Sequence, residues 1–148
     1  MAKTFVVAGC LLPALIALGL AAQGEQSTRE QVRRVLDIQT SAWNRGDLVA
    51  FMQEYAKSPE LTFFSGDTIE RGWEATLERY RKRYGTAGRN MGHLSFTEDR
   101  IDLLGPDAAL VTARWHLLMP DGKKLEGLTT VICKRTRDGW KIVHDHSS

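Results

Sequence analysis

The sequence predicts an α+β fold in which three N-terminal helices pack against a bent antiparallel sheet. Apolar residues recur at helical spacing up to Tyr84, and they alternate at strand spacing from His93 onward. Between Phe96 and Ile101 the apolar residues change parity, which indicates a bulge or sharp bend near Thr97 to Arg100. A sheet bent in this way curls around the helices and leaves a cavity at its open end.

The first residues have the composition of a secretory signal peptide. Lys3 supplies a positive start, the segment from Phe5 to Leu20 has no charge, and small residues follow up to Gly24. We therefore expect residues 1–24 to be a signal peptide, with cleavage after Ala22 or Gly24.

The alternative is a retained membrane anchor, but the apolar stretch is slightly short for spanning and Pro13 interrupts it. We expect residues 25–148 to form one domain in the periplasm or outside the cell, with no membrane attachment after cleavage.

The composition excludes a strongly charged partner. The net charge is +2, and 26% of the residues are charged, with basic and acidic side chains interleaved, so nucleic acid is not an expected partner. Cleavage would leave Cys133 as the only cysteine, and its apolar strand pattern predicts a buried structural residue.

The helices are predicted from their boundaries. Ser27 and Glu30 form a capping box at the start of the first helix, which ends at Gly46. Asp47 can cap a second helix. A third helix carries Trp73, Leu77, Tyr80 and Tyr84 on one face and ends before Gly85.

One short strand is predicted among the helices, and a meander of four strands follows them. Turn signals at Gly105-Pro106-Asp107, Pro120-Asp121-Gly122 and Asp138-Gly139 separate the last four. The predicted strands are Leu61–Phe64, His93–Leu104, Ala108–Met119, Lys123–Arg137 and Trp140–His146.

Three stretches resemble the nuclear transport factor 2-like superfamily: Trp43 to Asp47, Gly105 to Ala109 entering a strand, and Gly139 to Ser148. Within it, the chain resembles the polyketide-cyclase-like and calmodulin-kinase-association-like branch of bacterial proteins. The resemblance implies a cone-shaped fold and a homodimer. The superfamily includes isomerases, dehydratases, cyclases and non-catalytic assembly domains, so the fold does not choose among these activities.

The sequence departs from the kinase-association relatives at the arginines with which they hold carboxylate ligands. Alignment of Asp107-Ala108-Ala109 puts one such arginine at Trp115 and another near Val131. Arg114 lies one residue away and faces the opposite side of its strand unless a bulge intervenes.

The last strand supplies the candidate catalytic residues, His144 and His146. Alternation places them on the face of Trp140, which favours burial, so both histidines are expected to point into the cone. The alternative is that both only complete the sheet. Asp145 is expected to face away from the cone, toward a dimer surface or Lys141.

Other residues are candidates for lining the pocket. Arg114 is an anion ligand if its face lines the cavity, and the alternative is a place on a dimer face. A zinc site of His144 and His146 with His93 or His116 is the alternative to our expectation of no metal and no cofactor. The candidate ligand-binding residues are Trp43, Tyr55, Phe64, Arg114, Trp115 and His116.

The sequence thus predicts an exported, homodimeric domain that binds a hydrophobic or acidic small molecule in an internal pocket. Two alternatives remain open: an isomerase, cyclase or dehydratase that uses a pocket histidine for proton transfer, and a non-catalytic dimerisation module.

Overall fold

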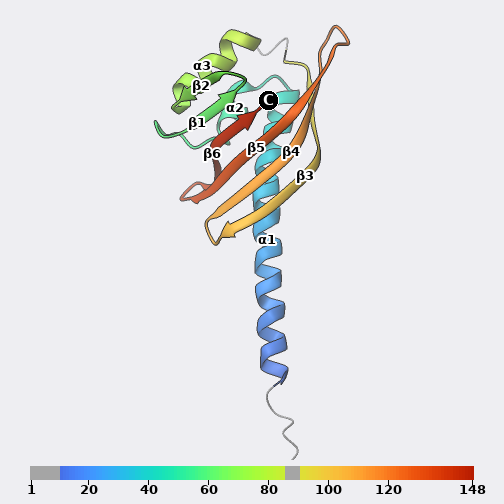
Figure 1. Ribbon diagram of the computed structural model, residues 1–148, viewed down its shortest axis with the longest axis vertical. Coiled ribbons are helices and arrows are strands. Elements are labelled where there is room, and N and C mark those ends of the chain that lie inside the picture. Colours follow the sequence, from blue (N-terminus) through green and yellow to red (C-terminus); the bar gives the residue numbers. More distant parts are fainter. Residues whose placement is uncertain (1–10, 86–90) are drawn as a thin grey trace, which may run out of the picture.

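The structure is a computed structural model that describes residues 11–85 and 91–148, so the first ten residues of the predicted signal peptide lie outside it. Within the described residues three helices pack against one six-stranded sheet, which confirms the α+β class (Figure 1). The helices are α1 (Leu11–Asn44), α2 (Leu48–Met52) and α3 (Trp73–Tyr84), and the strands are β1 (Thr62–Ser65), β2 (Thr68–Arg71), β3 (His93–Gly105), β4 (Ala108–Leu118), β5 (Lys124–Thr136) and β6 (Gly139–Ser147).

The sheet has the order β2-β1-β6-β5-β4-β3. Strands β3 to β6 form the predicted antiparallel meander. The sheet as a whole is mixed rather than antiparallel, because β1 lies parallel to β6. Strand β2 was missed: it has four residues, and its one large apolar side chain, Ile69, is 55% exposed, so it has no buried alternation to recognise.

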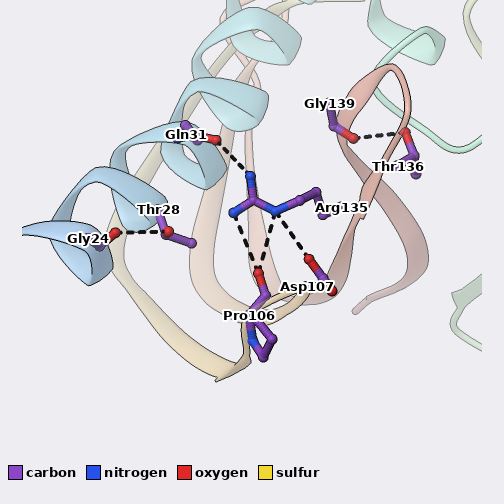
Figure 2. Close-up of polar contacts among 8 residues, drawn as sticks. All are labelled: Gly24, Thr28, Gln31, Pro106, Asp107, Arg135, Thr136 and Gly139. Carbon is purple, nitrogen blue, oxygen red and sulfur yellow. Dashed lines mark hydrogen bonds and ion pairs between the residues drawn. The ribbon is translucent and has the colours of Figure 1, made fainter. Parts of the chain in front are cut away.

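Helix α1 does not begin at the predicted capping box. It runs through Ser27 without a break, and the Thr28 hydroxyl donates to the Gly24 carbonyl one turn earlier (3.0 Å; Figure 2). The prediction was wrong because most residues before Ser27 are Ala, Leu, Gln and Glu, which favour a helix, so the helix continues through this segment despite Gly19 and Gly24.

The C-terminal half of α1 packs against the domain. Burial begins at Val32, whereas Ile16, Leu18 and Leu20 are each at least 60% exposed on the half that extends beyond the sheet (Figure 1). Among the described residues, none of the helices is both long enough and apolar enough to cross a membrane.

The predicted bend in β3 is present. The register against β4 shifts between Thr97 and Arg100, and Glu98 takes up a left-handed backbone conformation with φ of 54°. The shift turns residues of both parities toward the helices, so the change in apolar parity was a true signal of the bulge.

Arg135 ties the end of β5 to two other elements (Figure 2). Its guanidinium donates to the Pro106 carbonyl at 3.4 Å and to Gln31 on α1 at 3.4 Å, and it pairs with Asp107 at 3.3 Å. Its other face lies 4.9 Å from the centroid of the Trp140 ring. These contacts fix the β3–β4 turn against α1.

Cys133 lies in the core of the sheet with no exposed surface. Burial raises the pKa of its thiol to about 12, so the thiol stays protonated at neutral pH. The prediction of a structural cysteine is confirmed.

Candidate functional site

A cavity lies between the helices and the inner face of the sheet. Its volume is about 150 Å³, the size of engineered cavities that bind benzene. All three helices and five of the six strands contribute to the wall, which is mainly apolar and ringed by aromatic side chains. The aromatic residues that line it are Trp43, Phe51, Tyr55, Phe63, Tyr80, Tyr84, Phe96 and Trp115.

Trp43 organises the helical side of this wall. Its ring meets Phe51 and Tyr84 edge-on, with centroids 5.1 Å and 4.8 Å away, and its indole N–H donates to the Met91 carbonyl at 3.0 Å. These geometries are the favourable ones for aromatic pairs. The wall is therefore fixed by packing before any ligand enters.

The polar end of the cavity is the carboxyl group of Asp145, which is only 5% exposed. Its Oδ2 accepts from the Tyr55 hydroxyl at 2.6 Å. Its Oδ1 lies 2.7 Å from the Ser147 hydroxyl and 3.3 Å from the Thr129 hydroxyl. Three hydroxyl groups from three different segments thus hold one carboxyl group.

Backbone pairing brings Tyr55 to this carboxyl group. The segment after α2 runs beside β6 and pairs with it at Ile142, whose N–H donates to the Glu54 carbonyl at 2.9 Å. The Ala56 N–H in turn donates to the Ile142 carbonyl at 2.8 Å. Tyr55, between the two, is held with its ring toward Asp145.

A bulge in β6 turns Asp145 inward. Ile142 pairs with Cys133 and His144 pairs with Ile132, so Val143 is an extra residue in the strand. Strict alternation from Trp140 fails at this point. Our prediction that Asp145 faces outward was therefore wrong, and Lys141, its expected partner, pairs with Glu54 at 3.3 Å.

Burial dominates the ionisation of this site. Loss of solvent raises the pKa of Asp145 above its ordinary value, although the hydroxyl groups of Tyr55, Ser147 and Thr129 act in the opposite direction. Burial and the neighbouring carboxyl group also raise the pKa of Tyr55 well above 10.0, so its phenol remains a neutral donor. The site combines a carboxyl group that gains a proton readily with a donor that keeps its own.

The sequence profile of the SnoaL-like domain family matches residues 32–148, most of the chain. This protein is a member of the SnoaL-like domain family. No curated protein matches its sequence.

Solved structures place this SnoaL-like domain within the nuclear transport factor 2-like superfamily, which confirms the resemblance seen in the sequence. A nuclear transport factor 2-like protein of unknown function from Shewanella oneidensis is 36% identical over 82% of this chain and 98% of its own, with a TM-score of 0.77. A candidate dehydratase of that family from Streptomyces avermitilis is 24% identical (84% and 96%; TM-score 0.67). A candidate calcium/calmodulin-dependent protein kinase II association domain from Xanthomonas campestris is 20% identical (79% and 84%; TM-score 0.62).

The cavity of the SnoaL-like domain brings together only some of the residues that the sequence suggested. Trp43, Tyr55 and Trp115 line it. The other five candidate residues do not line it: Phe64, Arg114, His116, His144 and His146. The alternation of buried residues along the strands places these five on the opposite, outer face of the sheet.

The outward residues have partners of their own. His144 Nδ1 lies 2.7 Å from the Thr62 hydroxyl, and the Phe64 ring packs edge-on against its imidazole at 5.0 Å. Arg114 pairs with Glu98 at 3.5 Å, while His116 bonds the Thr97 hydroxyl at 2.8 Å and pairs with Glu126 at 3.3 Å. The expectation that the histidines point into the cone was wrong because of the Val143 bulge.

Several residues of the cavity were not candidates in the sequence. Gln39, Arg79, Ser147 and Thr129 line the cavity, but no motif in the sequence marks them. The sequence does contain one signal of the bulge in β6. Lys141, Val143 and Asp145 alternate with Trp140 and Ile142, and Val143 is the apolar residue of that otherwise polar set. Within the described parts of the chain, no three His, Cys, Asp or Glu side chains are grouped as metal ligands.

Proposed function

We propose that this domain binds a small, mostly apolar molecule in its cavity, and that Asp145 exchanges a proton with that molecule. The observation that carries this proposal is the position of Asp145: a buried carboxyl group at the end of an aromatic cavity. Buried ionisable groups with a raised pKa are typical of acid–base sites.

The surroundings of Asp145 suit this role. An aspartate of ordinary pKa is a weak base at neutral pH, and burial makes it a stronger one. The Tyr55 hydroxyl, 2.6 Å from Oδ2, orients the carboxyl group and stabilises its ionised form. The arrangement supports an isomerase, cyclase or dehydratase type of reaction, in which a proton moves to and from carbon, and the similarity to a candidate dehydratase is in keeping with it.

Acetophenone is a suitable probe, because it is close in size to the cavity and its methyl hydrogens exchange with solvent through acid–base steps. Incubation with the protein in D₂O is expected to accelerate deuteration of the methyl group, measured by NMR. Asp145→Asn is expected to abolish the acceleration, because an amide cannot take up the proton, while acetophenone binding persists.

The double variant His144→Asn/His146→Asn is the matched control, because both histidines lie outside the cavity. Unchanged exchange in this variant supports Asp145 as the base. Loss of exchange there, with retention in Asp145→Asn, would return the role to the histidines. Binding without exchange in the wild-type protein leaves a binding domain and refutes the catalytic role.

We also propose that the domain acts after export, with residues 1–24 removed. In support, the apolar residues Ile16, Leu18 and Leu20 are exposed, and they precede the family-matched region, which begins at residue 32. Mass spectrometry of the protein from the periplasm or medium is expected to show an N-terminus at Gln23 or Glu25. An intact N-terminus in the cytoplasm would contradict this proposal.

The outer face of the sheet is our candidate for a homodimer interface. Leu128 on β5 is 53% exposed there, beside Arg114 in register, and the rings of Phe64 and His144 share the same face. One structural neighbour is described as an association domain. Leu128→Lys is expected to shift the protein from dimer to monomer in sedimentation. A wild-type protein that is monomeric at all concentrations would exclude the dimer.

A further inference from the structure

We infer that Gln39 and Trp115 recognise the ligand in this cavity, and that the group they recognise is an uncharged carbonyl oxygen. The inference rests on the cavity of the proposed function, but not on proton transfer by Asp145.

Two side-chain donors in the cavity wall have no acceptor among the described residues. Gln39 on α1 is 3% exposed and Trp115 lies on β4, and both line the cavity. The amide nitrogen Nε2 of Gln39 and the indole nitrogen Nε1 of Trp115 are buried without a hydrogen-bond partner. Buried donors are paired in most native structures, so each exception calls for an explanation.

The polar groups around Asp145 are already matched to one another. Asp145 accepts from Tyr55 on Oδ2 and from Ser147 on Oδ1, so each of its oxygens already has a partner in the protein, and Oδ2 keeps a second lone pair. What the cavity lacks is an acceptor for Gln39 and Trp115. A ligand oxygen would supply an acceptor to each donor that it reaches, and each pairing would remove the penalty of an unsatisfied donor.

Charge favours a neutral carbonyl group over a carboxylate. Both unpartnered donors are uncharged, and a second anion in the cavity with Asp145 is unfavourable. The two arginines of the wall remain charged and act in the opposite direction, but each has contacts of its own. Arg79 pairs with Glu70 at 3.9 Å and lies 5.6 Å from the centroid of Phe63. Arg83 lies 5.5 Å from the centroid of Tyr84.

Trp140 provides an internal comparison. Its indole N–H is also buried without a partner among the described residues, but Trp140 is not part of the cavity wall. Trp140→Phe thus removes an unpartnered donor that a ligand in the cavity does not reach.

The test compares the affinities of acetophenone, ethylbenzene and benzoate, measured by calorimetry on the full-length protein. Without a donor, ethylbenzene binds better than acetophenone, because a buried carbonyl group loses its water. With both donors in place, we expect acetophenone to bind about tenfold more tightly than ethylbenzene, and benzoate to bind more weakly than acetophenone.

Gln39→Met keeps the length of the side chain and removes its donor, and we expect it to abolish the preference for acetophenone while ethylbenzene binding is unchanged. The ligand-free variant should melt at or above the wild-type temperature, because an unsatisfied polar group has been removed. Trp115→Phe should also weaken the preference, and Trp140→Phe should preserve it.

The outcomes separate this inference from the proposed function. Equal affinity for acetophenone and ethylbenzene in the wild-type protein overturns the carbonyl site but leaves the cavity. Tighter binding of benzoate overturns the choice of a neutral group. A lower melting temperature of Gln39→Met with an unchanged preference assigns Gln39 a purely structural role. No binding of any probe refutes the ligand cavity itself.

Discussion

The contact between Tyr55 and Asp145 makes the most direct prediction about the site. Tyr55→Phe removes one oxygen and leaves the ring, so the cavity wall keeps its shape. The lost hydroxyl donates to Oδ2 of Asp145 at 2.6 Å in a buried position. That short distance is typical of a hydroxyl donating to an ionised carboxylate.

The expected size of the effect depends on pH. With Asp145 ionised, loss of a hydrogen bond to a charged group lowers the free energy of unfolding by about 1.5–3 kcal/mol. With Asp145 protonated, the bond joins neutral groups and its loss costs about 0.5–1.5 kcal/mol. The same substitution raises the pKa of Asp145 further, because the Tyr55 hydroxyl is one of the groups that lower it.

Urea unfolding from pH 4 to pH 9 measures the first effect, and NMR of labelled aspartate carboxyl carbons measures the second. Tyr84→Phe is the matched control, because Tyr84 lines the same cavity and no hydrogen bond links its hydroxyl to Asp145 among the described residues. A loss of stability in Tyr55→Phe that is independent of pH, or equal to that of Tyr84→Phe, would refute the assignment.

Three further predictions concern the stability of the domain. Because burial raises the pKa of Asp145, the stability that this group contributes is fully present below the ordinary aspartate pKa and is lost as pH rises through the folded pKa. In urea unfolding, the free energy of unfolding of Asp145→Asn should therefore rise relative to that of the wild type over this pH window. A difference that stays constant with pH would contradict this. Gly127→Ala would place a Cβ atom 1.7 Å from the Ser148 carbonyl oxygen and 2.6 Å from the Trp115 ring, so the chain end must move, and a loss of about 1–3 kcal/mol is expected in thermal unfolding. Arg135→Ala should lower the free energy of unfolding by no more than about 1 kcal/mol, because the ion pair of Arg135 with Asp107 is largely exposed. A greater loss would show that the stacking of Arg135 on Trp140 stabilises the domain more than this ion pair does.

The two bulges explain why part of this structure was predictable and part was not. In β3 the apolar residues Leu94 and Phe96 lie before the bulge and Ile101 and Leu103 after it, so both parities are marked and the change is visible. In β6 the residues after the bulge are polar. Because neither His144 nor Asp145 is apolar, the sequence does not show which of the two is buried, and strict alternation predicted the wrong one.

The pairing of Tyr55 with β6 could not be predicted from the sequence for a different reason. It depends on a single bridge at Ile142 between segments nearly ninety residues apart. No local pattern encodes such a contact. The sequence indicated Tyr55 as an aromatic residue with a useful hydroxyl, but only the fold shows which group accepts its hydrogen bond.

Most of the polar groups that do not help the core of this domain lie around the cavity. Asp145 is buried there although burial disfavours its ionised form. Of the three side-chain donors that are buried without an acceptor among the described residues, those of Gln39 and Trp115 are in the cavity wall and that of Trp140 is outside it. A core selected for stability alone would contain apolar side chains at these positions. Local departures from good packing are expected at functional sites, because the missing partner is the ligand. The cavity, rather than the outer face with its histidines, is therefore where chemistry should be sought.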